Sequence, residues 1–112
     1  MSPITTHVLD TSLGRPASGV SALLERRIAD GSFVALGRGV TDADGRIRDL
    51  LSGPLETGTF RLTFDTAAYF DAQGKTGFYP TVAIVFQVVD ASQHHHVPLL
   101  LSPFGYSTYR GS

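Results

Sequence analysis

Histidines are the residues of this chain best suited to chemistry near neutral pH, because an unperturbed imidazole titrates at about pH 6.5. Three of the four stand in a row, at His94, His95 and His96, and the fourth is His7. Side chains alternate in an extended segment, so His94 and His96 should share one side and His95 should point to the other. Three interpretations are open: a solvated strand end, a pair of acid–base groups, or a zinc site formed by His7, His94 and His96.

The end of the sequence is also rich in hydrogen-bonding groups. Residues 106–112 are polar, aromatic and basic, and the apolar residues 97–101 join them to the histidines. Arg110 and Ser112 are two positions apart, so an extended backbone would present a guanidinium and a hydroxyl on one side, beside the terminal carboxylate. This combination suits a planar or anionic ligand, and the alternative is a solvated terminus.

The segment Asp42-Ala-Asp-Gly45 has the composition of a tight turn or of a calcium loop. If Gly45 held the sixth position of such a loop, Leu51 would hold the twelfth, where a bidentate glutamate is required. The calcium interpretation fails, and we expect a turn that presents Arg46. The Gly-x-Ser-x-Gly motif is absent, which argues against Ser112 as a covalent nucleophile.

The composition limits the class of protein. With 112 residues, 42% hydrophobic and 17% charged, the chain is predicted to form one globular domain over residues 1–112. A net charge of −1 gives no basic surface for nucleic acid, and no apolar run is long enough to span a membrane. Disulfides and thiol chemistry are excluded because there is no cysteine. Nothing near the N-terminus has the pattern of a secretory signal, so we expect a cytoplasmic protein without nucleic-acid or membrane partners.

The elements that would position these groups are mainly β-strands. Short alternating or β-branched segments separated by turns predict seven or eight strands in a two-sheet sandwich, an all-β fold. Thr66 is expected to cap one short helix over residues 67–73, which Gly74 would end. Residues 29–32 read as a hairpin turn. The predicted strands are residues 4–10, 20–28, 33–41, 59–65, 81–89, 97–101 and 106–110.

The glycines, apolar runs and few charges of these strands predict how the strands pack. Gly37 and Gly39 should weaken their strand or let another backbone approach. Residues 81–89 are so continuously apolar that both faces are expected to be covered. The last strands carry few charges, and residues 98–103 are apolar, so we expect a homo-oligomer with two-fold symmetry built through them. The residues expected to face the core are Val20, Ala22, Leu24, Ile28, Phe60, Leu62 and Phe64.

The sequence resembles one family over essentially its whole length. The matching segments are Thr6-His-Val-Leu-Asp10, Gly14-Arg-Pro-Ala17, Asp44-Gly-Arg46, His96-Val-Pro-Leu-Leu-Leu-Ser-Pro103 and Tyr109-Arg-Gly-Ser112. They resemble the 5-hydroxyisourate hydrolases, transthyretin-like enzymes of urate degradation in purine metabolism. The last segment separates these enzymes from the hormone carriers of the same fold. The family usually has an aromatic residue where this chain has His95, and little effect on the chemistry is expected because His95 points away.

This resemblance implies a transthyretin-like (prealbumin-like) sandwich with one short helix, assembled as a homotetramer, a dimer of dimers with sites where the dimers meet. It implies opening of the lactam ring of 5-hydroxyisourate to 2-oxo-4-hydroxy-4-carboxy-5-ureidoimidazoline, with no metal or other cofactor. His7 and His96 would activate water, Arg46 would bind the substrate and the oxyanion, and Ser112 would orient a histidine or the substrate. His94, Tyr109 and Arg110 would add to substrate binding. A non-catalytic carrier of small aromatic ligands and the zinc hydrolase remain the alternatives.

Overall fold

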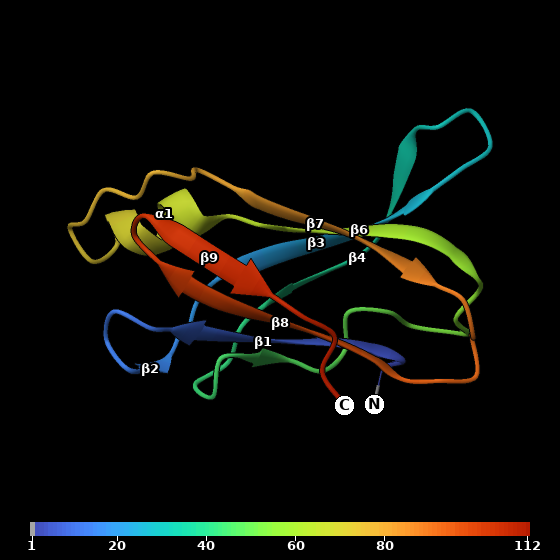
Figure 1. Ribbon diagram of the computed structural model, residues 1–112, viewed down its shortest axis with the longest axis horizontal. Helices are drawn as coiled ribbons and strands as arrows, with labels where there is room; N and C mark the ends of the chain where they lie inside the picture. Colours follow the sequence, from blue (N-terminus) through green and yellow to red (C-terminus); the bar gives the residue numbers. More distant parts are fainter. Residues whose placement is uncertain (1) are drawn as a thin grey trace.

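The computed structural model describes residues 2–112 as two β-sheets packed against each other, with one short helix at an end of the sandwich (Figure 1). Without the two-residue strands β2 and β5, seven strands remain among these residues, which confirms the predicted all-β sandwich. One sheet contains β1 (Ile4–Asp10), β2 (Arg15–Pro16), β5 (Arg46–Ile47), β8 (His95–Ser102) and β9 (Gly105–Thr108). The other contains β3 (Ser21–Arg27), β4 (Phe33–Val40), β6 (Gly58–Phe64) and β7 (Val82–Val88).

The first sheet is organised around β1. This strand pairs in parallel with β8 over its whole length, from Ile4 opposite His95 to Asp10 opposite Leu101. Its other edge is shared by β5 and β2, both antiparallel, while β9 runs antiparallel to the far side of β8. The parallel pairing and the bridge between His96 and Gly111 place the start of β1 near the C-terminal residues (Figure 1). It also brings the segment that contains His7 beside the segment that contains the other histidines.

The core between the sheets follows the alternation expected from the sequence, with one exception. Ile28 was predicted to be buried, and this is wrong, because it is 41% exposed. Strand β3 ends at Arg27, and an irregular register between Leu24 and Glu25 interrupts its alternation, so Ile28 lies in the hairpin turn. The predicted core residues confirmed as buried are Val20, Ala22, Leu24, Phe60, Leu62 and Phe64.

Strand β7 has one covered face rather than two, so the prediction for residues 81–89 is wrong in this respect. Buried Val82, Ile84 and Val88 alternate with exposed or half-buried residues, and Val85 is 59% exposed. The reason is that β7 belongs to an antiparallel sheet whose inner face alone packs against the other sheet; among the described residues it pairs only with β6. Such sheets commonly bury one face and leave the other open.

The helix α1 (Thr66–Asp71) is capped one residue earlier than predicted. Asp65, not Thr66, is the N-cap, and its carboxylate accepts a hydrogen bond from a backbone N–H of the first turn. Aspartate is at least as effective a cap as threonine. Thr66 is buried, and its hydroxyl instead donates to the carbonyl oxygen of Tyr79 at 2.6 Å. Gly74 follows the helix with a φ of 68°, the conformation expected of a glycine that ends it.

Two glycines of β4 allow close packing by β5 and the segment after it, and the approach of another backbone that was predicted occurs at Gly37. A Cβ atom on Gly37 would overlap the carbonyl oxygen of Leu50, and one on Gly39 would lie 2.6 Å from Cγ2 of Ile47. Ile47 is therefore held in the core at 3% exposure. Because side chains alternate along a strand, its neighbour Arg46 is turned to the outer face of the β1–β8 sheet.

Candidate functional site

The turn before β5 presents Arg46 as the sequence predicted. The carboxylate of Asp42 accepts hydrogen bonds from the backbone N–H groups of Asp44 and Arg46, and Gly45 has a φ of 76°. A side chain at Gly45 would also collide with the backbone of β1, since its Cβ would lie 2.4 Å from a carbonyl oxygen there. Arg46 then stands opposite His7 in the antiparallel ladder of β1 and β5. The two side chains share the outer face.

Two of the consecutive histidines share that face as well, although β8 begins only at His95. The hydroxyl oxygen of Thr5 lies 3.0 Å from Nε2 of His94 and 2.8 Å from Nδ1 of His96. Thr5 and His96 are direct partners in the parallel ladder. His95 points the other way, as predicted, and is 4% exposed, with Nδ1 2.9 Å from the carbonyl oxygen of Gln93.

The last residues of the sequence fold back over His96. The N–H of Gly111 donates to the carbonyl oxygen of His96 at 2.8 Å. A Cβ atom at Gly111 would lie 2.6 Å from Cδ2 of the His96 ring and 3.3 Å from Cγ of Pro98, so only glycine fits against the imidazole. This contact brings Ser112 to the same surface.

These groups surround a cavity of about 170 Å³ on the outer face of the β1–β8 sheet, here called the histidine cavity. Four predicted site residues line it, namely Arg46, His94, His96 and Ser112. His7 stands beside it, opposite Arg46 and two positions along β1 from Thr5. The complete lining is Thr5, Thr6, Arg46, Arg48, His94, His96 and Ser112.

Burial and nearby positive charge favour the neutral forms of His7 and His96, the two histidines predicted to be catalytic. Burial lowers the pKa of His96, and the Arg46 guanidinium and the imidazoles of His7 and His94 lower it further. Burial and Arg46 also lower the pKa of His7, against the opposing effects of a hydrogen bond to the backbone of Asp44 and of nearby acidic groups. A neutral imidazole is the form that can accept a proton from water.

The sequence matches the HIUase/Transthyretin family model over residues 4–111. The chain belongs to this family. Among its relatives is the 5-hydroxyisourate hydrolase of Mus musculus, 46% identical over 113 residues that cover 99% of this chain and 96% of the relative. The resemblance stated from the sequence motifs is confirmed.

Solved structures of the HIUase/transthyretin family have the same fold. The structure of Klebsiella pneumoniae 5-hydroxyisourate hydrolase superposes with a TM-score of 0.85 at 39% identity, covering 97% of this chain and 98% of that chain. Sea bream transthyretin in complex with thyroxine superposes with a TM-score of 0.91 at 36% identity, covering 98% and 95%. Because a 5-hydroxyisourate hydrolase and a thyroxine-binding transthyretin share this architecture, the side chains of the site must decide between the two functions.

Tyr109 and Arg110 do not line the histidine cavity. They border a neighbouring cavity of about 250 Å³, and His96 belongs to the lining of both. Arg110 donates to the side-chain oxygen of Gln93 at 2.9 Å. Strand β9 ends at Thr108, and the bridge between Gly111 and His96 bends the chain, so Arg110 and Ser112 border different cavities rather than one.

Sequence reasoning missed Thr5 and Arg48. Arg48 lines the histidine cavity and forms an ion pair with Asp42 at 2.8 Å, which ties it to the turn before β5. Thr5 precedes His7 by two positions, so alternation along a strand could have placed it on the same face. Its contacts with His94 and His96 depend on the pairing of β1 with β8, which the motifs do not reveal.

Two further properties bear on the predicted class of protein. Among residues 2–112, no group of three or more histidine and acidic side chains is arranged to hold a metal ion. His94 and His96, two of the three ligands in the zinc interpretation, instead meet at the hydroxyl of Thr5. In the same part of the chain, no helix has the length and apolar character needed to cross a membrane.

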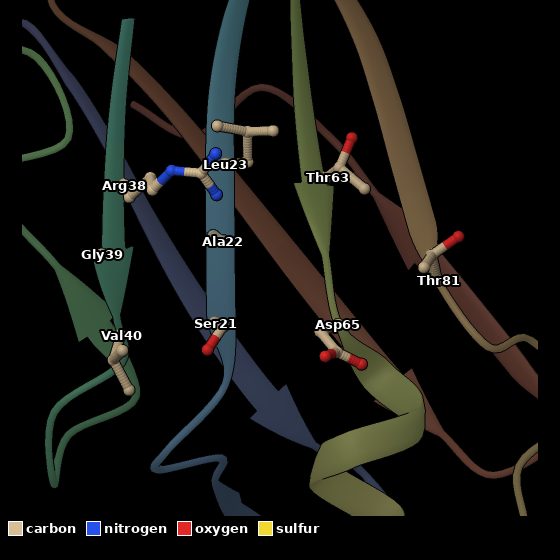
Figure 2. Close-up of a pocket in the computed structure, with 9 residues that line it drawn as sticks. All are labelled: Ser21, Ala22, Leu23, Arg38, Gly39, Val40, Thr63, Asp65 and Thr81. Carbon is tan, nitrogen blue, oxygen red and sulfur yellow. The ribbon is translucent and has the colours of Figure 1, made fainter. Parts of the chain in front are cut away.

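A larger cavity, of about 570 Å³, lies on the outer face of the other sheet. Figure 2 shows its lining residues spread across β4, β3 and β6, with Asp65 just after β6 and Thr81 just before β7. The Arg38 side chain extends toward Leu23 (Figure 2). Hydroxyl groups and one carboxylate, that of Asp65, complete the polar part of the lining. Asp65 already caps α1, and no histidine is present, so this cavity lacks an acid–base group suited to neutral pH.

Proposed function

We propose that this chain is a hydrolase that opens the lactam ring of 5-hydroxyisourate in urate degradation, giving 2-oxo-4-hydroxy-4-carboxy-5-ureidoimidazoline. The observation that carries the proposal is the convergence of a guanidinium and neutral imidazoles at one small cavity. Membership of the HIUase/transthyretin family and near full-length relatives named 5-hydroxyisourate hydrolase support the choice of substrate.

His96 is the proposed base. Its Nδ1 is engaged with Thr5, so Nε2 is the nitrogen free to take a proton from water. His7, on the same face, holds the attacking water together with His96. Attack on the ring carbonyl forms a tetrahedral oxyanion, and one of the two histidines then returns a proton to the leaving nitrogen. The reaction consumes one water molecule and requires no covalent intermediate with the protein.

Arg46 binds the ring oxygens and stabilises the oxyanion. A guanidinium presents a planar fork of donors that remains charged at any working pH, and preorganised donors of this kind supply a large part of catalysis. Ser112 orients the substrate or a histidine from the other side of the histidine cavity. His94 contacts the substrate within the histidine cavity. Tyr109 and Arg110 contact parts of the substrate that extend past His96, the residue common to both cavities.

The homotetramer, a dimer of dimers, also remains a proposal. The edge strand β7 and the loops beside it and β9 expose large apolar side chains, with Phe78 69%, Val85 59% and Phe104 75% exposed. Pairing of these edges in two copies would bury the apolar groups, and contact between the outer faces of two β1–β8 sheets would enclose the site. Light scattering on the purified protein tests this, and a monomer at micromolar concentration would contradict it.

The hydrolase is tested by the ultraviolet absorbance decay of freshly generated 5-hydroxyisourate. We expect the wild-type protein to accelerate the decay, and His96→Ala and a chain ending at Tyr109 to lose the acceleration while keeping their fold and assembly. A chelator should leave the wild-type rate unchanged, whereas loss of activity on chelation would favour the zinc alternative. If the wild type does not accelerate the decay, the result favours the non-catalytic carrier, and binding of small aromatic ligands is the next measurement.

A further inference from the structure

Thr5 contacts two histidines through a single oxygen atom. Its Oγ1 lies 3.0 Å from Nε2 of His94 and 2.8 Å from Nδ1 of His96. The threonine is only 5% exposed, and His96 is its direct partner in the parallel ladder, so the backbone holds the hydroxyl at this place. The two imidazole rings are nearly parallel, at 22°, with centroids 6.4 Å apart.

A hydroxyl carries one proton, and this limits how the two rings can be protonated. Thr5 can donate to only one of the two nitrogens, and the other nitrogen must donate to Thr5. If Thr5 donates to His94, Nδ1 of His96 carries a proton and Nε2 of neutral His96 is free. If Thr5 donates to Nδ1 of His96, the proton of neutral His96 lies on Nε2, which can no longer act as a base.

We propose that Thr5 is a positioning residue that sets the tautomer of His96, with His94 as the acceptor of the Thr5 proton, so that Nε2 of His96 is the base. The inference deepens the proposed function and rests on it, because only a base requires a free Nε2. In the ring, Nε2 is bonded to Cδ2, the atom that lies against Gly111, so Nε2 is on the side of the C-terminal residues that border the histidine cavity. When Nε2 takes a proton from water, the Nδ1–H bond to Thr5 becomes charge-assisted and stronger.

Protonation of the exposed His94 reverses this arrangement. An imidazolium at His94 must donate from Nε2, so Thr5 then donates to His96, and the proton of neutral His96 moves to Nε2. Besides His94, Arg46 on β5 and His7 on β1 oppose a positive charge on His96, and the guanidinium of Arg48 lines the same cavity. In that arrangement Nε2 of His96 already carries a proton and cannot accept one from water, so the hydrogen bonds of Thr5 couple the protonation patterns of the two rings.

The test compares Thr5→Val, which keeps the shape but removes the hydroxyl, with Thr5→Ser, which keeps the hydroxyl. In the decay assay, Thr5→Val should lower kcat about 10- to 100-fold with little change in KM, which is part of the about 10²- to 10⁴-fold that acid–base catalysis supplies. Thr5→Ser should stay within about threefold of the wild type, because it retains the donor and acceptor. Thr66→Val is the matched control, since it also removes a buried hydroxyl with a hydrogen bond but lies in α1. It should leave kcat unchanged.

Nitrogen-15 NMR of the imidazoles reads the tautomer without substrate. The wild type and Thr5→Ser should carry the neutral His96 proton on Nδ1, whereas Thr5→Val should show a mixture of tautomers. A wild-type proton on Nε2, or an unchanged kcat in folded Thr5→Val, would overturn the inference. If Thr5→Val does not fold, the wild-type spectrum decides: a proton on Nδ1 of neutral His96 supports the inference, and a proton on Nε2 overturns it. If the wild-type protein does not accelerate the decay, the proposed function is wrong. If the wild type is active and Thr5→Val has the same kcat, only the inference about Thr5 is wrong.

Discussion

Two arginines, Arg61 and Arg46, lie on the two outer faces of the sandwich and differ in how their charges are balanced. On the β4-β3-β6-β7 face, the guanidinium of Arg61 lies 2.9 Å from the Glu25 carboxylate of the neighbouring strand and 4.1 Å from the centre of the Phe33 ring. On the β1–β8 face, Arg46 takes part in none of the ion pairs found among residues 2–112. Its closest functional neighbours are histidines whose protonation it opposes. A paired charge stabilises a surface modestly, whereas an unpaired charge is available to a substrate.

The volumes of the two cavities do not identify the site. The cavity of the β4-β3-β6-β7 face, whose lining Figure 2 shows, is the larger at about 570 Å³. The histidine cavity measures about 170 Å³. A sandwich face of twisted strands is hollow for geometric reasons, so volume alone does not identify a site. The chemistry of the lining groups and the perturbed pKa values of the histidines separate the two faces.

The largest expected effect comes from removing the unpaired charge. Arg46→Ala should lower kcat/KM for 5-hydroxyisourate about 10²- to 10³-fold, the usual loss when an oxyanion donor is removed. NMR titration should also show the pKa values of His7 and His96 rising, because the guanidinium lowers both. Arg38→Ala, an exposed arginine on the opposite face, is the matched control and should keep the wild-type rate. Equal losses in the two variants would contradict the comparison of the faces.

A smaller effect is expected from crowding the His96 ring. Gly111→Ala places a Cβ atom 2.6 Å from Cδ2 of His96, so the imidazole must move. We expect kcat to fall about 10-fold, since small displacements of a reacting group are costly. Gly105→Ala lies in the same part of the chain, where the new Cβ would be 3.7 Å from the Ser102 hydroxyl, an ordinary contact, and should be close to wild type. An unaffected Gly111→Ala would show that the ring position is not critical.

The pH dependence of kcat/KM and of the free energy of unfolding distinguishes histidines with a lowered pKa from histidines with an ordinary one. Burial and Arg46 lower the pKa values of both His7 and His96 below 6.5, so kcat/KM should be level above that pH and fall only below it. Because the unfolded chain binds these protons more readily, the free energy of unfolding should also decrease as the pH falls from 6.5 through the folded pKa values. Rate and denaturant profiles measure the two effects. An activity midpoint above pH 6.5 would contradict the lowered pKa values.

The smallest effect on activity is expected from removing a buried hydrogen bond that lies at neither cavity and contributes only to stability. The hydroxyl of Tyr69 in α1 donates to the buried carboxylate of Asp10 at 2.6 Å, and burial with this bond raises the pKa of Tyr69 to about 12. Tyr69→Phe should cost about 1–3 kcal/mol, because it leaves the carboxylate one donor short. Tyr79→Phe, at a tyrosine that is 38% exposed, should cost less than about 0.5 kcal/mol. Denaturant unfolding measures both, and kcat should not change in either.

Local pattern predicted those parts of the fold that depend on near neighbours. The alternation of Phe60, Leu62 and Phe64 and the turn before Arg46 follow from side-chain period and from glycine at a positive φ. The errors arose where the choice depended on more distant contacts. Asp65 and Thr66 are both good caps, and the choice was made by the bond from Thr66 to Tyr79. The apolar run of β7 does not show that only one face of its sheet is covered.

The sequence by itself determined which chemical groups this protein has and which of them share a side. His94 and His96 are paired by alternation, and the motifs around His7, Arg46 and Ser112 identify the family. Only the tertiary structure decided that a threonine hydroxyl lies between the two histidines and that Gly111 packs against one of the rings. The physical reason is the parallel pairing of β1 with β8, whose register is set by the burial of both strands against the whole core rather than by any local residue.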